Sequence, residues 1–262
     1  MKRFGFLIAS LGLVATGAVA QDSYQDWAAA GIPDRGTSAS TVGSADVRGG
    51  ALTFADRASF NSAVGTLPLE DFEGGATAAG AVNTCTEPVS SASNDPCFAP
   101  GDLIAGFQIT SSGGGGVVAL GDGLIGQPST VIGANIFADF TTVTFTGGNV
   151  TAVGLDAFSG SGGGNVDIRV FDSGGALADT ITLAPSADNV SEFFGIFAPG
   201  PISRIEIEGT STSGELFDNL AFGTGAQEPP VSVPALGLAG TFLGTALLLL
   251  IAGFALRSRA SH

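Results

Sequence analysis

The chain has 262 residues, is rich in glycine and carries a formal net charge of −15 at pH 7. Its segment from Gln21 to Val233 holds all 24 acidic residues and five basic ones, a formal charge of −19. This balance argues against nucleic acid as a partner, because phosphate contacts need clustered Lys and Arg. The single histidine is His262, the last residue. The segment therefore lacks the usual general base, Ser-His and Cys-His pairs and histidine metal ligands, and we do not expect an enzyme.

The first 20 residues have the three parts of a secretory signal peptide. Lys2 and Arg3 make a positive start, and an apolar stretch follows. Ala18 and Ala20 then form a small-x-small cleavage site directly before Gln21. We therefore expect residues 1–20 to be removed and the rest of the chain to be exported.

The C-terminus has the pattern of a membrane anchor. Residues 235–256 contain no charged side chain. At about 1.5 Å per residue a helix over this span reaches roughly 33 Å, enough to cross a hydrocarbon core of about 30 Å. The tail that follows, residues 257–262, contains Arg257 and Arg259. The positive-inside rule places these arginines in the cytoplasm, so we expect an inner-membrane protein with an exported domain.

Three segments lie between the two ends. Residues 21–50 show no apolar period and are expected to form a flexible N-terminal arm. Residues 51–224 are expected to form a single β-sandwich domain, and residues 225–234 a linker to the anchor.

The domain is predicted to open with a helix over residues 53–64. Thr53 and Asp56 have the spacing of a capping box, Phe60 and Val64 share one face, and Gly65 would end the helix.

Ten segments rich in β-forming residues, separated by Gly-rich turns, are predicted to be strands. They are Leu69–Glu73, Ile104–Thr110, Val117–Leu120, Ala138–Thr146, Val150–Phe158, Asn165–Asp172, Leu177–Leu183, Glu192–Phe197, Ile202–Glu208 and Leu216–Phe222. Apolar and charged residues alternate in Ile205–Glu208, as in a half-buried antiparallel strand. The pattern predicts an all-β fold: an antiparallel two-sheet sandwich of jelly-roll type.

Two cysteines, Cys85 and Cys97, lie in a polar segment of the exported part. In an oxidising compartment a pair at this separation predicts a disulfide that closes a surface loop. A metal site would need further Cys or His nearby, and the sequence has none there.

Oxygen-bearing side chains gather at the first and last predicted strands. They are Glu70, Asp71, Glu73, Asp218 and Asn219. The first and last strands of a jelly roll are commonly neighbours, so these side chains could together bind Ca²⁺, which takes six to eight such ligands. The alternative is that they are solvated polar residues at strand ends. Three other acids, Asp156, Asp172 and Asp188, are interpreted as turn residues.

The tail resembles the PEP-CTERM family of sorting domains. The resemblance rests on a Pro-bearing motif (Pro229, Pro230, Val233 and Pro234), the hydrophobic helix and the final arginines, although the usual Pro-Glu-Pro is absent. It implies recognition by an exosortase, a sortase-like processing enzyme that would pass the protein to the cell surface. The alternative is a permanent single-span anchor.

The core is similar to the surface domains that carry such tails. The similar motifs are Phe54-x-Asp56-Arg57-x-x-Phe60, Glu70-Asp71-Phe72-Glu73-Gly74 and Phe217-Asp218-Asn219-Leu220-Ala221-Phe222-Gly223. They imply a galactose-binding-like or lectin-like sandwich.

The sequence therefore predicts an exported envelope protein, membrane-anchored or sorted to the surface or extracellular matrix. Its function would be structural or adhesive, or the binding of extracellular polysaccharide, with no cofactor beyond structural Ca²⁺. The alternative is a carboxylate-dependent enzyme acting on glycans, since an Asp/Glu pair suffices for glycoside hydrolysis.

Overall fold

The computed structural model describes residues 23–30, 46–48, 50–160, 164–185, 190–210 and 213–226, with the backbone alone at residues 30 and 46–48. These residues belong to the first of two compact units, Met1–Ala226 and Gln227–His262. The predicted signal peptide, sorting motif, membrane helix and basic tail lie outside the described residues. Within the described parts, no helix has the length and apolar character needed to cross a membrane.

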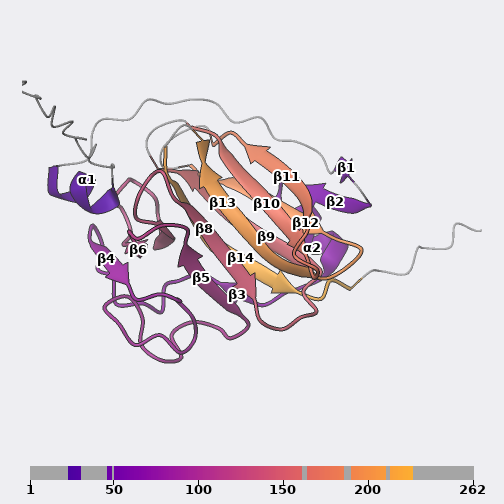
Figure 1. Cartoon of the computed structure of the whole chain (residues 1–262), viewed down its shortest axis with the longest axis horizontal. Coiled ribbons are helices and arrows are strands. Elements are labelled where there is room, and N and C mark those ends of the chain that lie inside the picture. The colour runs from indigo at the N-terminus through magenta and orange to yellow at the C-terminus, as the bar shows by residue number, and fades with distance from the viewer. Residues whose placement is uncertain are drawn as a thin grey trace, which may run out of the picture. The chain divides into compact units, whose positions relative to one another are not determined.

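Two antiparallel β-sheets face each other (Figure 1). The larger sheet runs in the order β1 (Asp46–Arg48), β2 (Ala51–Phe54), β12 (Glu192–Phe197), β9 (Ala152–Ser159), β14 (Glu215–Gly223), β7 (Val131–Ala134), β6 (Val117–Leu120) and β4 (Val82–Cys85), and β3 (Leu69–Glu70) also pairs with β14. The smaller sheet runs in the order β11 (Leu177–Leu183), β10 (Val166–Asp172), β13 (Ile202–Gly209), β8 (Phe140–Phe145) and β5 (Phe107–Ser111). From β8 to β14 the chain crosses repeatedly between the two sheets.

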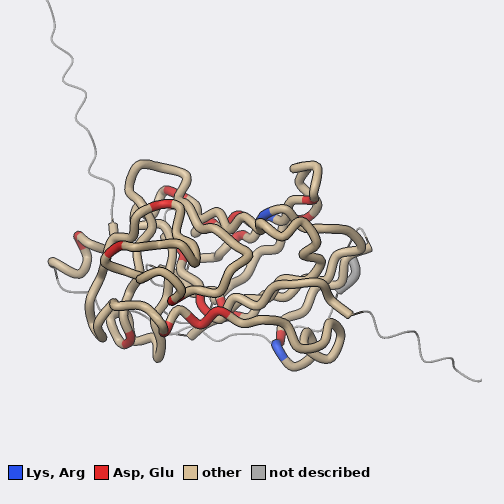
Figure 2. The backbone as a smooth tube through the Cα atoms, turned by 90° about the horizontal axis from the view of Figure 1, so that it is seen from below, with Lys and Arg blue, Asp and Glu red and all other residues tan. Residues whose placement is uncertain are grey.

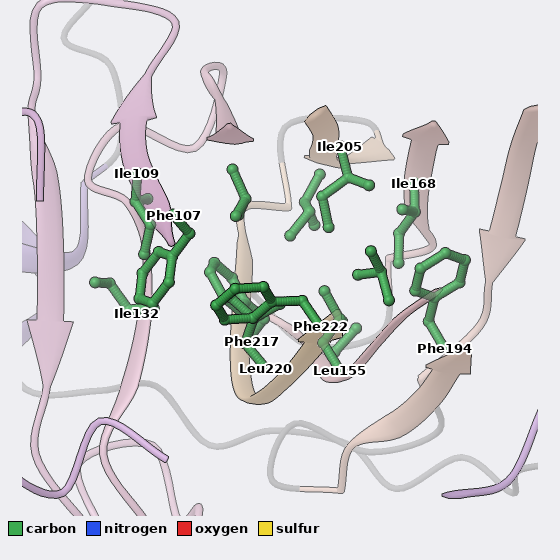
Figure 3. Packing of buried hydrophobic residues seen from close by; sticks show 14 of the residues in the cluster. Phe107, Ile109, Ile132, Leu155, Ile168, Phe194, Ile205, Phe217, Leu220 and Phe222 are labelled. Carbon is green, nitrogen blue, oxygen red and sulfur yellow. The ribbon is translucent and has the colours of Figure 1, made fainter. Parts of the chain in front are cut away.

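The core lies between the sheets and is built by alternating apolar residues. In β10 the buried positions are Val166, Ile168 and Val170, with half-buried polar residues between them. Figure 3 shows Ile168 and Ile205 of the smaller sheet directed toward Phe194 and Leu155 of the larger sheet. Burial of such side chains is the main favourable term in folding, at roughly 25 cal/mol per Å² of apolar surface.

All ten predicted strands are present, with ends that differ by a few residues. Four strands were not predicted: β1, β2, β4 and β7. They have three or four residues each, too few to show a period-two pattern. The sequence of β7, Val-Ile-Gly-Ala, is buried throughout and carries no alternation at all.

The predicted helix is correct in kind, but its start is wrong. Thr53 lies in β2, and helix α2 (Arg57–Val64) begins after Asp56, whose carboxylate accepts a hydrogen bond from the Ser59 backbone N–H at 2.8 Å. Asp56 is therefore the N-cap residue. The predicted C-terminal end is confirmed: Gly65 follows the helix with φ of +80°, a value that glycine adopts at no steric cost.

The expectation of a flexible arm over residues 21–50 is wrong for its first part. Residues Tyr24–Ala30 form helix α1, and the Tyr24 side chain is only 1% exposed. The ring packs edge-on against Phe137 with centroids 4.6 Å apart, and its hydroxyl donates to the Glu215 backbone carbonyl at 3.3 Å. Two aromatic residues, Tyr24 and Trp27, pack this short helix against Phe137, and seven residues are too few to show a helical period.

The predicted disulfide is confirmed. Cys85, at the end of β4, is bonded to Cys97, and their Cα atoms are 5.3 Å apart. In the chain-entropy model such a loop closure contributes about 3 kcal/mol.

Candidate functional site

The structure brings the first and last predicted strands side by side, as expected. Strand β3 pairs with β14, with Glu70 opposite Leu220. The five predicted site residues, however, divide into two groups. Glu70 is buried and accepts hydrogen bonds from the backbone N–H groups of Phe72 and Ile104 at 2.8 and 2.7 Å. Asp71 is exposed and accepts from the Glu73 N–H. Asp71 therefore stabilises the turn after β3, and Glu70 joins that turn to the backbone at Ile104.

The second group is a polar network around Asp218. The Asp218 carboxylate accepts from the Ser129 hydroxyl and from the Asn219 backbone N–H. The Asn219 amide donates to both Asp218, at 3.1 Å, and Asp156, at 2.9 Å. Nearby, Glu73 accepts from the Thr130 backbone N–H at 2.6 Å. Glu73, Asp218 and Asn219 are thus engaged with protein donors and acceptors.

The interpretation of Asp156 as a turn residue is wrong. It lies inside β9, opposite Asp218, and does not occupy a turn. Its carboxylate forms an ion pair with Arg57 at 3.0 Å, and the same guanidinium donates to the Asn219 carbonyl. Asp172 does occupy a turn, where it accepts from the Gly174 and Ala176 N–H groups. Asp188 lies outside the described residues.

The network includes an irregular stretch of backbone. The register of β14 against β9 shifts between Asp218 and Ala221, as in a β-bulge. Asn219 takes a φ of +53° there, and Phe72, which follows β3, takes +56°. Asparagine tolerates this left-handed conformation, whereas for phenylalanine it is a genuine outlier held by packing. The Phe72 ring is fully buried against Phe98, Phe107 and Phe217.

Burial also sets the protonation of Asp218. Loss of hydration raises the pKa of Asp218 from 3.8 to about 6, with a smaller rise from the charges of Asp156 and Glu73. Burial likewise raises the pKa of Glu70. Asp218 is therefore partly protonated in mildly acidic solution, next to an Asp156 that is paired with Arg57.

This carboxylate pair does not form an accessible catalytic site. A pair of neighbouring carboxyl groups is the catalytic pattern of a glycosidase. Asp218 is only 1% exposed, however, so its carboxyl group is shielded from a sugar in solution. We interpret the network as structural: the hydrogen bond and ion pair of Arg57 connect helix α2 to the bulge in β14 and to β9.

The calcium hypothesis stays a prediction. In the described part of the chain, no three or more His, Cys, Asp or Glu side chains are grouped in a way that could hold a metal ion. Glu70 and Glu73 use their oxygens on backbone N–H groups from different segments.

The structure reveals a second region that sequence reasoning missed, a groove on the open side of the sandwich. It consists of two hollows that follow one another along β11 and separate this edge strand from β2 and β12 of the larger sheet. We call it the β11 groove. The first hollow, of about 330 Å³, is lined by Ala51, Val170, Phe171, Asp172, Ser173, Ala178, Asp179, Ile196, Ala198, Pro199, Gly200, Pro201 and Ile202. The second, of about 260 Å³, is lined by Thr53, Phe54, Ala55, Ile181, Thr182, Leu183, Glu192, Phe193, Phe194 and Gly195.

The first hollow combines an apolar lining with polar residues, one of which, Asp179, has an unsatisfied buried oxygen. Phe171, Pro199 and Pro201 supply apolar surface. Asp179 uses Oδ1 to accept from the Thr180 N–H at 2.8 Å, while its Oδ2 is shielded from solvent and has no hydrogen-bond partner. Buried polar atoms are normally hydrogen-bonded, so such an atom calls for an explanation. Because Oδ2 has almost no solvent-accessible surface, a ligand in the hollow does not reach it in this conformation of the side chain.

Sequence could have given one signal for this groove. Strand β11 has the sequence Leu-Ala-Asp-Thr-Ile-Thr-Leu, in which the charged Asp179 interrupts a β-forming run. Charged and polar residues of this kind are typical of an edge strand. The groove itself depends on the pairing order, because β2 and β12 come from positions far apart in the chain. No local pattern contains that information.

Comparisons with known proteins identify no family. No protein-family model and no curated protein matches the chain. Among solved structures, the enzymatically active domain of a tailspike protein of bacteriophage CBA120 is 20% identical, with a TM-score of 0.27. That match covers 45% of this chain, which spans 19% of the tailspike domain.

Two further matches are carbohydrate-binding modules. One, from Clostridium stercorarium in complex with cellobiose, is 12% identical, covers 56% of this chain and 97% of the module, and has a TM-score of 0.31. The other is the family 11 module of a cellulosomal cellulase of Clostridium thermocellum. It is 12% identical, covers 48% of this chain and 92% of the module, and has a TM-score of 0.19.

Proposed function

We propose that this chain is an exported envelope protein whose jelly-roll sandwich binds polysaccharide in the β11 groove. One observation carries the proposal: the first hollow joins an apolar lining to the polar residues Asp172, Ser173 and Asp179. A sugar ring offers the matching chemistry, because it has apolar C–H faces and hydroxyl donors around its edge. Ligand sites in proteins are mostly apolar hollows with a few placed polar groups.

The dimensions of the groove suit an extended chain. Its volume of about 330 Å³ places the first hollow at the small end of ligand pockets, which span about 300–1,000 Å³. The second hollow continues along β11, whose seven residues extend roughly 23 Å at about 3.3 Å each. A linear glycan could therefore occupy both hollows with successive sugars.

Export is part of the proposal. It is supported by the predicted signal peptide of residues 1–20 and by the disulfide between Cys85 and Cys97, since disulfides persist in oxidising compartments. The predicted anchor, residues 235–256, would hold the domain at the inner membrane, and processing at the sorting-type motif would release it to the surface. In either place the ligand within reach is extracellular polysaccharide.

The test is to fill the groove. Ala178 lines the first hollow and is exposed, so the Ala178→Trp variant of the full chain in detergent should place an indole where a sugar would bind. Ala176 lies in the same β10–β11 hairpin, is also exposed, and is not among the lining residues, so Ala176→Trp is the matched control. Both proteins would be titrated calorimetrically with a panel of soluble polysaccharides.

We expect at least one polysaccharide to bind the unmodified chain and the control, and binding to Ala178→Trp to fall tenfold or more. Equal binding by both variants would refute the groove as the site. A chain that binds no member of the panel would refute the proposed function.

A further inference from the structure

The end of the sandwich at which the described chain stops is built from turns joined by hydrogen bonds. Beyond β14, the Ala226 N–H donates to the Val64 carbonyl, at the end of α2, at 2.9 Å. The Gly223 carbonyl accepts from the Thr151 N–H at 2.9 Å, and the Thr151 carbonyl accepts from the Ala198 N–H at 2.8 Å. Turns far apart in the sequence therefore meet where the chain leaves the domain. We call this surface the exit end, and it comprises residues 64–69, 104–106, 146–151, 198–202 and 223–226.

The exit end has no charged residue of its own in an otherwise acidic domain. None of its five segments contains Asp, Glu, Lys or Arg. Charged residues flank it, among them Glu70, which is buried, Asp172, which accepts N–H groups of its own hairpin, and Arg48, whose side chain is outside the described part. Figure 2 shows tan tube at the point where the described chain stops, with the red and blue positions farther away along the domain.

Apolar side chains are exposed on this surface. Leu69 is 48% exposed, and Pro68 and Pro199 are exposed as well. A single exposed leucine needs no explanation on a protein surface. Here, however, its surroundings are uncharged, so contact with an apolar or interfacial environment would not strip water from a charge of the exit end.

The course of the chain beyond Ala226 decides what such a surface can meet. Residues 227–234 lead directly to the predicted membrane span of residues 235–256. Eight residues reach at most about 29 Å even when fully extended. A bilayer that held this span would therefore lie within that distance of Ala226. The acidic surfaces of the domain would be repelled by anionic headgroups, whereas the exit end would not.

From the place of exit and the absence of charge we infer that the exit end is a membrane-contact surface, which lies on a phospholipid bilayer with Leu69 at the level of the headgroups. The inference rests on the anchor in the proposed function and goes beyond it by assigning the face that meets lipid. Tethering keeps the local concentration of lipid high, so a contact too weak to recruit a free domain still orients an anchored one. Residues 198–202 also line the first hollow, so the bilayer borders the β11 groove at one end.

The experiment measures contact between tryptophan and lipid. The full chain is reconstituted into vesicles of phosphatidylethanolamine and phosphatidylglycerol, with or without lipids brominated near the headgroup, which quench tryptophan fluorescence on contact. Leu69→Trp and Gly200→Trp each place an indole at the exit end. Gly114→Trp is the matched control, because an added Cβ has nothing within 4 Å at either glycine. Gly114 lies between β5 and β6, beyond the Ser112 N–H that bonds the start of β8, whereas the end of β8 leads into the exit end.

We expect brominated lipid to lower the fluorescence of both exit-end variants. Gly114→Trp should stay at the level of the unmodified chain, whose single tryptophan is Trp27 of α1. The near-ultraviolet circular dichroism of each variant is compared with that of the unmodified chain first, and two exit-end positions keep the test available if one of them disturbs the fold.

Equal quenching of the control, or an unquenched exit-end tryptophan in a folded variant, would refute the membrane-contact surface. Flotation of the vesicles separates this failure from that of the proposed anchor. A chain that floats with the vesicles but is not quenched keeps its anchor and loses only the contact surface. A chain that does not float with them has no anchor, and both proposals fall.

Discussion

At the scale of single residues, the unusual feature of this domain is how many acids are buried without a cation. Glu215 is fully buried; it accepts from the Thr141 hydroxyl at 2.7 Å and from the Gly209 N–H at 3.3 Å. Burial raises the pKa of Glu215 well above its ordinary value. Asp218 and Glu70 are shifted in the same direction. The folded state therefore holds protons that the unfolded state would release.

Asp218 allows this coupling to be measured. Its pKa is raised from 3.8 to about 6 on folding, so its contribution to stability is greatest below about pH 4 and is lost as the pH rises to about 6. The loss amounts to about 3 kcal/mol. An Asn side chain cannot ionise, so Asp218→Asn should unfold with a flatter pH dependence between pH 4 and 6 and be the more stable protein at pH 7.

The measurement is urea unfolding of both proteins across that pH range, with Asp122→Asn as an exposed-carboxylate control. Identical slopes for Asp218→Asn and the unmodified chain would show that Asp218 ionises in the folded state as it does in the unfolded state.

At the scale of elements, helix α1 is held in place through the buried side chain of Tyr24, which lies beside Gly160. A Cβ atom at Gly160 would lie 1.9 Å from the Tyr24 hydroxyl oxygen and 2.8 Å from the Ser213 carbonyl oxygen. Gly160→Ala should therefore expel Tyr24 and release α1. Full burial of a large apolar side chain contributes roughly 1.5–3 kcal/mol, and we expect a loss of stability of that order.

Trp27 reports on this release because it is the single tryptophan of the chain and packs on Phe137, with ring centroids 4.6 Å apart. Its fluorescence should shift to the red in Gly160→Ala. Gly114→Ala, where an added Cβ has nothing within 4 Å, should leave the emission unchanged. An unshifted spectrum in Gly160→Ala would mean that α1 is not held through Tyr24.

The same elements show what sequence can and cannot predict. Long strands such as β10 and β13 were predictable, because alternation over seven or eight residues is visible locally. The neighbouring positions of β3 and β14 were also expected, because the first and last strands of a jelly roll are commonly neighbours. The pairing of Asp156 with Arg57 and the unpaired Oδ2 of Asp179 were not predictable, because each depends on contacts between segments far apart in the chain.

At the scale of the whole molecule, acidic positions are distributed along the described chain, with few basic positions among them (Figure 2). The arginines whose side chains the structure describes, Arg57, Arg169 and Arg204, all lie in ion pairs. Like-charge repulsion is therefore uncompensated at neutral pH and destabilises the compact state.

Two effects of pH act on this fold: repulsion between the exposed carboxylates, and the loss of protons from the buried acids. Both effects weaken the fold as carboxyl groups lose protons, so the melting temperature of the full chain in detergent should be highest in mildly acidic solution and fall toward pH 7. Sodium chloride should raise it at pH 7, because salt screens repulsion between exposed charges. Scanning calorimetry across pH and salt checks both trends. A melting temperature that peaks at neutral pH and ignores salt would contradict them. Adding Ca²⁺ at constant ionic strength separates screening from specific binding: a rise over sodium alone would support an ion at the predicted calcium residues, and an unchanged value would count against that hypothesis.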